Sequence, residues 1–508
     1  MSKWHIIAFD AGGTAVKAAL YDESGRECAV AGVAMAPLHP APGYLERDPE
    51  AMWAAICATT RNVLHAAAVA PSSIAVVGLT GYGNGLYLAD RNGEPVRNGI
   101  LSPDQRAQGE VARWREGGLE AGVIALTWHK LWAGKPLPLI AWLEKHEPET
   151  LARAARALVC KDYIRYRLTG VLATEISDLS SGGLIDQRAR QWTPAVLDCL
   201  GLRRYERLFG DALEPLTIAG AVTEKAAHAT GLVAGTPVSA GYADGPAMAL
   251  GLGATDESLI SVISGTWGLN QLASRIPITD GSISAPIMGP RAGEFILTDA
   301  GPTSASAFEW FVDSVVARAD GGRRDRDALF DFCNREVAQT RASDAIPYFL
   351  PYLNGRLDQP DARGSFIGLA SWHGLPEMVR AIYEGVAFEH RGHIEHLLKG
   401  RDRPLAARFA GGAARSRPWL EIFAAAIDLP LEIAEAEELG ALGAAIIAAV
   451  GAGLYPDLET AVASMTRIRA HIEPDAALAE ILARRSVAFK ALRNALNPLW
   501  ARLGIPSS

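Results

Sequence analysis

The stretch Asp10-Ala11-Gly12-Gly13-Thr14-Ala15-Val16-Lys17 stands between two apolar runs, His5 to Phe9 and Val16 to Tyr21. Cys28 to Met35 is a third strand candidate, reached through a polar turn. Three short strands joined by glycine-containing turns predict a β-meander at the start of the chain. This segment sets the fold class, because a meander followed by helices and further strands predicts a mixed sheet.

The first turn has the composition of an anion-binding loop. Gly12 and Gly13 let backbone N–H groups close around an anion, Thr14 adds a hydroxyl donor and Lys17 adds positive charge. Asp10 ends a strand, where its carboxylate would suit Mg²⁺ or the waters of that ion. The alternative is a simple hairpin closed by an Asp–Gly turn, since glycine-rich turns are common.

A similar arrangement begins the second half. Leu259 to Ile263 is mostly apolar, Ser264-Gly265-Thr266 forms a polar turn, and the chain returns through Gly268 to Ala273. Two such turns in separate halves predict a duplicated fold whose two lobes grip one phosphate chain from opposite sides. Two unrelated hairpins are the alternative, because identity between the segments is slight.

Between these turns the chain alternates helices and strands. Asp48-Pro49-Glu50 predicts a helix that runs to about Ala67, with Asp48 as N-cap and proline at the first position. Ile74 to Leu79 is a continuous apolar run, typical of a strand buried on both faces. We place a domain boundary in Gly245 to Gly253, which gives domains 1–248 and 249–508.

The second half continues in the same alternation. We expect a helix around Pro376 to Leu397, a strand around Ala407 to Ala410, a helix around Ser416 to Ile427 and a strand at Leu431 to Ile433. The small-residue segment after Gly440 predicts a buried helix.

Three further motifs place polar groups at the ends of predicted strands. Asp244, in Gly241-Tyr242-Ala243-Asp244-Gly245, follows an apolar run and is a candidate to accept a proton from a hydroxyl nucleophile. Gly411-Gly412, before Arg415 and Ser416, would let a flat ring or a phosphate approach the start of a helix. The alternative for Asp244 is an aspartate that only forms a turn. The alternative for the glycine pair is an ordinary βα turn with Ser416 as the helix N-cap.

The third motif combines Gly81-Tyr82-Gly83-Asn84-Gly85 with Ser102-Pro103-Asp104-Gln105-Arg106. An amide, a carboxylate and a guanidinium near one strand end would hydrogen-bond several hydroxyl groups. Ordinary loop chemistry is the alternative.

Composition excludes several functional classes. The chain has 508 residues, 49 Lys and Arg against 57 Asp and Glu, and a net charge of −8, which argues against broad nucleic-acid binding. No stretch of about 20 apolar residues is present to cross a bilayer, and the start at Met1-Ser2-Lys3 lacks a signal-peptide pattern, so we expect a cytoplasmic protein. Five widely spaced cysteines indicate small buried side chains, with no disulfide framework and no zinc site.

Taken together, these residues resemble the FGGY family of carbohydrate kinases, from about Ile6 to Ala491. The most specific match is Gly364-Ser365-Phe366-Ile367-Gly368-Leu369, followed after seven residues by Glu377 to Glu384. Within the family, Gly85 to Ala107 looks most like L-xylulose (3-keto-L-gulonate) kinases, and other segments resemble erythritol kinases. The resemblance implies an α/β, actin-like (ribonuclease H-like) duplicated fold with two lobes around a central cleft.

The resemblance also implies residue roles. Asp244 corresponds to the catalytic base, which also touches the substrate, and Asp10 to the acid that organises Mg²⁺. The residues expected to bind ATP are Gly12, Gly13, Thr14 and Lys17 in the first phosphate turn, Gly265 and Thr266 in the second, and Gly411, Gly412 and Arg415 in the adenosine motif. Gly83, Asn84 and Asp104 fall where relatives hold the sugar.

One departure from the family pattern bears on the substrate, because D-xylulose kinases have a Met-His pair where Gly83-Asn84 stand, which argues against D-xylulose. Leu139 replaces a lysine of the N-terminal signature, which indicates a subfamily change away from the chemistry. The expected reaction is ATP-dependent phosphorylation of a terminal hydroxyl of a small ketose such as L-xylulose or 3-keto-L-gulonate. The alternatives are a kinase for erythritol, D-xylulose, ribulose or glycerol, or a non-catalytic actin-like nucleotide-binding protein. Homodimers are common in the family, and the sequence fixes neither the oligomeric state nor the regulation.

Overall fold

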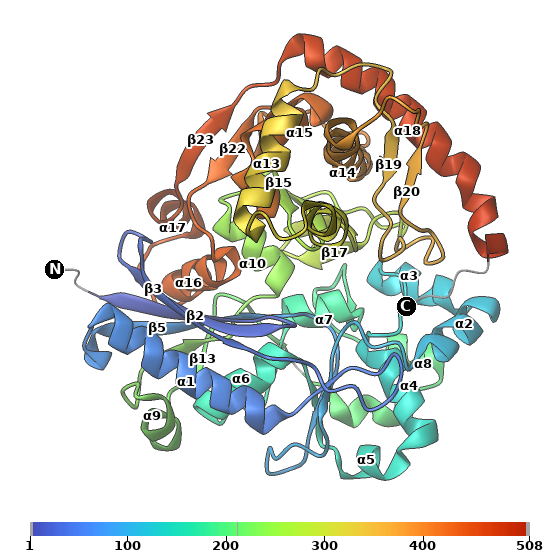
Figure 1. Ribbon diagram of the computed structural model, residues 1–508. Helices are drawn as coiled ribbons and strands as arrows, with labels where there is room; N and C mark the ends of the chain where they lie inside the picture. Colours follow the sequence, from blue (N-terminus) through green and yellow to red (C-terminus); the bar gives the residue numbers. More distant parts are fainter. Residues whose placement is uncertain (1–3, 211, 504–508) are drawn as a thin grey trace. The chain divides into compact units, whose positions relative to one another are not determined.

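The computed structural model describes residues 4–210 and 212–503, which form two compact units (Figure 1). Unit 1 holds the described residues up to Thr255 together with Ala273–Leu297 and Glu438–Thr466. Unit 2 holds Asp256–Leu272, Thr298–Glu437 and the described residues from Arg467 onward. Residues 1–3, on which the expected absence of a signal peptide partly rests, lie outside the described residues.

Unit 1 contains the first sheet and most of the chain's short connecting elements. In chain order its strands and helices are β1 (His5–Ala11), β2 (Ala15–Asp22), β3 (Glu27–Ala34), β4 (Glu46–Arg47), α1 (Pro49–Ala67), β5 (Ile74–Gly81), β6 (Tyr87–Ala89), β7 (Gly99–Ile100), α2 (Gln108–Glu116), α3 (Leu119–Thr127), α4 (Pro136–His146), α5 (Pro148–Arg153), β8 (Arg156–Leu158), α6 (Cys160–Thr169), β9 (Thr174–Glu175), α7 (Ile176–Gly182), β10 (Ile185–Asp186), β11 (Gln191–Trp192), α8 (Ala195–Leu200), β12 (Ala212–Leu213), β13 (Ile218–Ala221), α9 (Glu224–Thr230), β14 (Pro237–Ser239), α10 (Asp244–Gly251), β17 (Ala285–Met288), α16 (Leu439–Gly451) and α17 (Leu458–Met465).

The sheet of unit 1 has the strand order β13-β14-β5-β1-β2-β3. β1, β2 and β3 form the predicted antiparallel meander, and β5 joins β1 in parallel. Helix α1 packs against β2 and β3, whereas α16 packs against β1 and β5 (Figure 1). The central strands are therefore covered on both faces, which explains their continuous apolar sequence.

Unit 2 contains the second sheet. Its elements are β15 (Leu259–Ser264), most of β16 (Gly268–Ser274) and of β18 (Phe295–Gly301), α11 (Ser306–Phe311), α12 (Ala317–Asp320), α13 (Arg326–Gln339), β19 (Tyr348–Leu350), β20 (Ser365–Ile367), α14 (Leu375–Leu397), β21 (Ala406–Ala410), α15 (Arg417–Ile427), β22 (Leu431–Ala434), β23 (Ile468–Ile472) and α18 (Ala476–Leu503).

The two sheets share one topology. In unit 2 the strand order is β18-β16-β15-β21-β22-β23. β15 and β16 are antiparallel, β21 joins β15 in parallel, and β23 closes the edge antiparallel to β22. Strand β15 thus takes the place of β1, and β21 the place of β5. This correspondence supports the predicted duplication, which sequence identity alone left weak.

Most of the predicted local elements are confirmed. Asp48 caps α1 through hydrogen bonds to the N–H groups of Glu50 and Ala51, and Ser416 caps α15 through the N–H of Trp419. The small-residue helix after Gly440 is α16, and most of its side chains are buried. The five cysteines are free, and Cys57, Cys160 and Cys333 are buried.

Two expectations differ from the structure in detail. Asp244 begins helix α10, and four residues separate it from the end of β14. The residues Gly245–Gly253, around the predicted boundary, mostly belong to the same helix, and unit 1 continues to Thr255. The domains 1–248 and 249–508 stay a prediction, because compact unit 1 also includes Ala273–Leu297 and Glu438–Thr466 from the second half of the chain.

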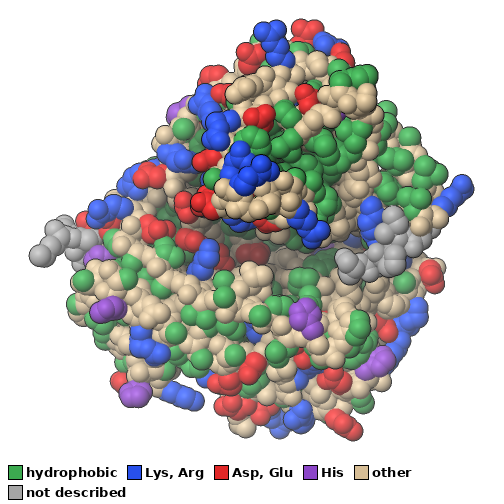
Figure 2. Space-filling view, viewed as in Figure 1, with side chains coloured by type: hydrophobic (Ala, Val, Ile, Leu, Met, Phe, Trp, Pro, Cys, Tyr) green, Lys and Arg blue, Asp and Glu red, His purple; other side chains and the backbone are tan. Residues whose placement is uncertain are grey.

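The surface shows no field of one sign on the face drawn in Figure 2, where basic and acidic side chains are interspersed. Within the described residues, no helix is both long and apolar enough to span a bilayer.

Candidate active site

Three carboxylates of unit 1 lie close together beside the first turn. Asp10 is in the last part of β1, Asp244 begins α10, and Glu438 precedes α16. Burial raises the pKa of Asp10 to about 7, and the negative charges of Asp244 and Glu438 add to this effect. The structure thus brings two predicted site residues, Asp10 and Asp244, into one electrostatic neighbourhood.

Backbone contacts fix the position of Asp244. Its Oδ1 accepts a hydrogen bond of 2.7 Å from the N–H of Gly245, and the backbone of Gly83 also hydrogen-bonds the carboxylate. The segment before it is anchored because the N–H of Tyr242 donates to Leu79 O and its carbonyl accepts from Thr80 Oγ1. Burial raises the pKa of Asp244 to about 6, although the hydrogen bonds from these backbone donors act to lower it. The residue as a whole has intermediate exposure.

The first turn is held by a buried cation. Arg47, 1% exposed, donates from Nη1 to Gly12 O at 3.1 Å and from Nη2 to Gly13 O at 2.7 Å. In a trans peptide the carbonyl and the next N–H point in opposite directions. Holding these carbonyls inward therefore directs the N–H groups of Gly13 and Thr14 outward, and both residues are exposed.

Lys17 and Asp10 both face the start of α16. Lys17 Nζ lies 2.8 Å and 3.0 Å from the two carboxylate oxygens of Glu438. A Cβ atom on Gly440 would lie 2.3 Å from Asp10 Oδ2, so only glycine allows α16 to begin this close to the carboxylate. The phosphate-binding role of Lys17 stays a prediction, with Glu438 as the partner that the sequence did not reveal.

The predicted sugar residues have different surroundings. Asn84 is 9% exposed with φ of 62°, and its Nδ2 donates to Ser181 Oγ at 3.2 Å. Asp104 is fully buried, and its carboxylate accepts hydrogen bonds from the N–H of Leu45 and from the backbone and guanidinium of Arg106. These four bonds use the acceptor sites of a carboxylate, so the structure offers no free lone pair for the predicted sugar contact of Asp104.

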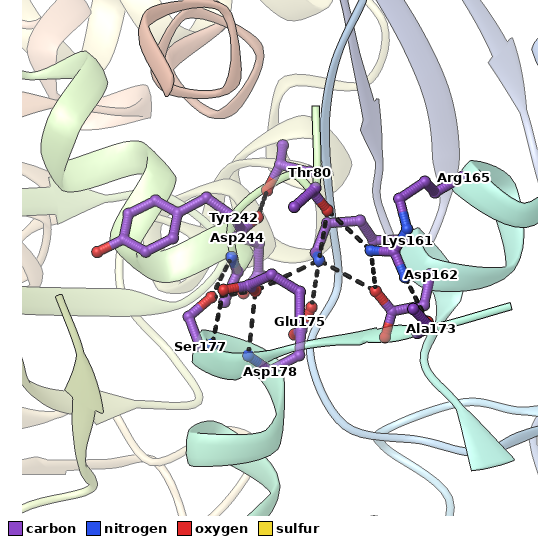
Figure 3. Close-up of polar contacts among 12 residues, drawn as sticks. Thr80, Lys161, Asp162, Arg165, Ala173, Glu175, Ser177, Asp178, Tyr242 and Asp244 are labelled. Carbon is purple, nitrogen blue, oxygen red and sulfur yellow. Dashed lines mark hydrogen bonds and ion pairs between the residues drawn. The ribbon is translucent and has the colours of Figure 1, made fainter. Parts of the chain in front are cut away.

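A buried ion cluster lies behind Asp244 (Figure 3). Lys161 Nζ is 3.0 Å from Asp178 Oδ2, 3.3 Å from Asp162 Oδ1 and 3.4 Å from Glu175 Oε2. Burial disfavours the ammonium group, but these carboxylates outweigh it and raise the pKa of Lys161. Ser177 connects the cluster to the site, because its Oγ donates to Glu175 and accepts from the N–H of Ala243. Sequence reasoning missed this cluster, whose members lie within residues 161–178 but on separate elements, α6, β9 and α7, that only the fold brings together.

The second turn, in unit 2, is supported by neutral groups. Ser264 Oγ lies 2.9 Å from Ser304 Oγ, which lies 2.8 Å from Nε2 of His390. Nδ1 of the same ring is 2.8 Å from Asn270 Oδ1. Burial lowers the pKa of His390 to about 3, so the imidazole is uncharged near neutral pH. Thr266, at the turn, is exposed.

The predicted adenosine motif adjoins this second turn. Gly411 has φ of 97°, and a Cβ there would lie 2.4 Å from Ser264 O, so both the conformation and the contact require glycine. Gly412 begins a short 3₁₀ turn, Gly412–Arg415, before α15. Arg415 is exposed and lies 3.6 Å from Glu437. The structure therefore places Gly265, Thr266, Gly411 and Gly412 together in unit 2.

Asp10 offers the type of ligand that a hard divalent cation takes, although among the described residues no three His, Cys, Asp or Glu side chains form a group that could hold a metal ion by themselves. Carboxylate oxygens are the ligands that Mg²⁺ prefers, and that ion usually keeps several waters and takes the rest of its ligands from substrate phosphates. Asp10 and Asp244 supply carboxylates whose pKa values are raised by burial, and a bound cation would favour their ionised forms.

Comparison with known proteins agrees with this geometry. The model of the FGGY family of carbohydrate kinases, N-terminal domain, matches residues 5–251, and that of the C-terminal domain matches residues 260–452. The chain is 33% identical over 499 residues to L-xylulose/3-keto-L-gulonate kinase of Escherichia coli (strain K12), covering 98% of each chain. It is 30% identical over 514 residues to erythritol kinase of Brucella abortus (strain 2308), covering 98% of this chain and 97% of the relative.

Among solved structures, xylulose kinase from Rhodospirillum rubrum superposes with a TM-score of 0.87 at 27% identity, covering 98% of this chain and 100% of that chain. This similarity confirms the expected α/β, actin-like duplicated fold, and the shared sheet topology described above is its basis.

Proposed function

The chain belongs to the FGGY family of carbohydrate kinases, and from this premise we propose that it phosphorylates a terminal hydroxyl of a small ketose with Asp244 as general base. The protein is a phosphotransferase that uses ATP as phosphoryl donor and acts on sugar hydroxyls. The substrates proposed first are L-xylulose and 3-keto-L-gulonate, since the relative that is 33% identical is named for both.

The observation that carries the proposal is the environment of Asp244. Asp244 has intermediate exposure as a residue, and its carboxylate is held by backbone N–H groups and has a pKa raised by burial to about 6. A base with this pKa is ionised at neutral pH and still accepts a proton effectively. Asp244 would take the proton of the attacking hydroxyl as its oxygen bonds to phosphorus.

The remaining roles follow the two turns. Asp10 would hold Mg²⁺, which supplies charge neutralisation of the phosphates when bound. Within unit 1, Gly12, Gly13 and Thr14 would aim N–H donors at phosphate oxygens, with Lys17 beside them. Within unit 2, the residues proposed to bind the nucleotide are Gly265, Thr266, Gly411, Gly412 and Arg415. A cytoplasmic location stays an expectation from the sequence, and a homodimer stays an expectation from the family resemblance.

A coupled assay of ADP release tests the proposal. The panel is L-xylulose, 3-keto-L-gulonate, D-xylulose, L-ribulose, erythritol and glycerol, each with ATP and Mg²⁺. We expect sugar-dependent ADP release that is greatest for one of the first two. Turnover with none of the six, or ATP consumption independent of sugar, would contradict the proposal and favour a non-catalytic nucleotide-binding protein.

One observation favours the sugar acid, 3-keto-L-gulonate, over the neutral ketose. Lys135 is 3% exposed, and within the described residues its Nζ has no hydrogen-bond partner. Burial lowers its pKa to about 7. The preceding residue, Gly134, accepts a hydrogen bond from the N–H of Gly85 in the sugar-side turn. Such a cation is stabilised by an anionic group, which a sugar acid brings and L-xylulose lacks.

The position of Lys135 suits the distal end of a sugar. A Cβ on Gly183, the C-cap of α7, would lie 3.5 Å from Lys135 Nζ. Gly183 is about 7.5 Å along the helix axis from Asp178, at about 1.5 Å per residue. This separation is comparable to the length of an open-chain sugar acid. We expect Lys135→Met to lower kcat/KM about tenfold for 3-keto-L-gulonate and less than threefold for L-xylulose, with exposed Lys130→Met as control. Equal losses for both sugars would contradict this assignment.

A further inference from the structure

Gly83 leaves an open space in front of three polar side chains of unit 1. A Cβ at this position would lie 3.5 Å from Asp178 Oδ1, 3.5 Å from Ser181 Oγ and 3.8 Å from Asp244 Oδ1. Gly83 is not among the glycines with positive φ, so its backbone does not require glycine. The absent side chain instead keeps a small polar space open directly beside the proposed base.

Two oxygens in this region have neither a hydrogen-bond partner nor an ion-pair partner within the part of the chain that the structure describes. They are Asp178 Oδ1, on a side chain 2% exposed, and Asn84 Oδ1, on a side chain 9% exposed. Asn84 is fixed from its other end, because its Nδ2 donates to Ser181 Oγ. Buried polar atoms are nearly always hydrogen-bonded in folded proteins, so these two oxygens indicate a ligand that is bound during function.

The ion cluster explains why Asp178 has one oxygen to spare. Its Oδ2 lies 3.0 Å from Lys161 Nζ, on the inner side of α7 (Figure 3). The cluster holds two cations, Lys161 and Arg165, against three carboxylates, Asp162, Glu175 and Asp178. One carboxylate is therefore in excess, and Oδ1 of Asp178 would lie 3.5 Å from a Cβ on Gly83.

We propose that Asp178, Ser181 and Asn84 form a hydroxyl-binding niche that receives the hydroxyl next to the one that is phosphorylated. The niche rests on the proposed function, because its position is defined relative to Asp244. Oxygens on adjacent sugar carbons are about one hydrogen-bond length apart, so a sugar whose terminal hydroxyl meets Asp244 places the next hydroxyl in front of Gly83.

The chemistry of the niche selects a hydroxyl over a carbonyl or a carboxylate. Burial raises the pKa of Asp178, despite the opposing charge of Lys161. A hydroxyl both donates and accepts, so it satisfies Asp178 whether or not the acid holds a proton. A carbonyl cannot donate to Asn84 Oδ1, and a carboxylate would add a further negative charge beside Asp178 and Asp244.

The first experiment compares Asp178→Ala with Asp162→Ala in the full-length enzyme. Both variants remove one carboxylate partner of Lys161, but only Asp178 faces the niche. With L-xylulose, or the panel sugar with the highest kcat/KM, we expect Asp178→Ala to raise the sugar KM at least tenfold and leave the ATP KM within twofold. Asp162→Ala should change the sugar KM less than threefold. Equal effects of the two variants would overturn the niche and leave Asp178 as an ion partner only.

An analogue of the same sugar that lacks the hydroxyl next to the phosphorylated carbon completes the test. We expect the kcat/KM of wild-type enzyme to be at least tenfold lower with this analogue than with the sugar itself. For Asp178→Ala the same change of substrate should lower kcat/KM less than threefold, because the variant already lacks the interaction that the analogue removes. Equal losses in both enzymes would show that Asp178 does not bind this hydroxyl.

A second variant keeps the test decisive if Asp178→Ala fails to fold. Gly83→Ala places a methyl group in the niche at ordinary contact distances and leaves the ion cluster intact. We expect a sugar KM at least tenfold higher with an unchanged melting temperature. Gly109→Ala, where nothing lies within 4 Å, is the matched control. An unchanged sugar KM in Gly83→Ala would refute the niche.

The two proposals fail in different ways. If wild-type enzyme phosphorylates no sugar of the panel, the proposed function fails and the niche fails with it. If wild-type enzyme phosphorylates a sugar but the Asp178 and Gly83 variants match their controls, only the niche fails.

Discussion

The two glycine turns occupy equivalent places in their units but are supported by different chemistry. The first connects β1 to β2, and the carbonyls of Gly12 and Gly13 accept hydrogen bonds from the buried guanidinium of Arg47. The second connects β15 to β16 and is held by the chain Ser264–Ser304–His390–Asn270. A duplicated backbone motif has thus kept its shape while its supporting residues diverged.

The difference concerns charge. Arg47 adds a buried positive charge beneath the first turn, and the acceptors of its hydrogen bonds are carbonyl oxygens, which do not neutralise it. His390 is neutral, since burial lowers its pKa to about 3. We therefore expect the first turn to contribute to anion binding through both orientation and electrostatics, and the second through orientation alone.

The largest effect is expected from removing the cation of the first turn. Arg47→Met leaves two turn carbonyls without donors and removes the buried charge, at about 1.5–3 kcal/mol for each charge-assisted hydrogen bond. We expect kcat/KM for ATP to fall about 10²-fold, because each 1.36 kcal/mol corresponds to a factor of ten. Arg47→Lys keeps the charge without the planar guanidinium group, so its kcat/KM for ATP should lie between those of the wild type and of Arg47→Met. A loss below threefold for Arg47→Met would remove the asymmetry between the turns.

A smaller effect is expected where the second turn meets the adenosine motif. Gly411→Ala introduces a Cβ 2.4 Å from Ser264 O at a position with positive φ. The expected cost in backbone strain is about 1–3 kcal/mol. We expect the Kd for ATP to rise about tenfold, measured by calorimetry, while the sugar KM changes less than twofold. A larger change for the sugar than for ATP would contradict nucleotide binding by unit 2.

Removing the neutral support should cost stability more than catalysis. His390→Leu leaves Ser304 and Asn270 with unpaired groups in the core of unit 2, at about 1–3 kcal/mol. We expect a lower free energy of unfolding and an ATP KM raised about threefold. If His390→Leu lowers kcat/KM as much as Arg47→Met, the distinction between charged and neutral support is wrong.

The pH dependence of activity should come from unit 1. Asp10 and Asp244 have pKa values raised to about 7 and 6, so both acids lose protons as the pH rises through this range, and kcat/KM should rise with them. His390 stays neutral above its pKa of about 3 and contributes no change there. With Mg²⁺ high enough to keep Asp10 ionised, Asp244 alone predicts about a twofold loss at pH 6 relative to pH 8, and the loss should grow to about twentyfold as Mg²⁺ is lowered. A flat profile from pH 5 to 8 would contradict this assignment.

Much of the fold could be predicted because its signals are local. The caps at Asp48 and Ser416 and the glycine turns are determined by neighbouring residues. The supports of the site could not be predicted, because their partners are distant in the sequence. Arg47 stands beside a clear helix cap, and only the folded chain shows that it binds Gly12 and Gly13.

The same limit applies to the sugar side. Asp178 belongs to a short helix of small and polar residues. Its importance depends on Gly83, which is remote in sequence, and on Lys161, which lies seventeen residues earlier on α6. Asp104 illustrates the converse case. Its residue type and position in a polar loop suggested sugar binding, but its acceptor sites are occupied by Arg106 and Leu45.

The role of Asp244 is tested most directly by comparing Asp244→Asn with wild-type enzyme in steady-state kinetics and in ATP binding by calorimetry. A general base contributes about 10²–10⁴ in rate. The account predicts that kcat falls by at least 10² while the Kd for ATP stays within threefold. A kcat close to that of the wild type, with the same sugar and at the same pH, would contradict it.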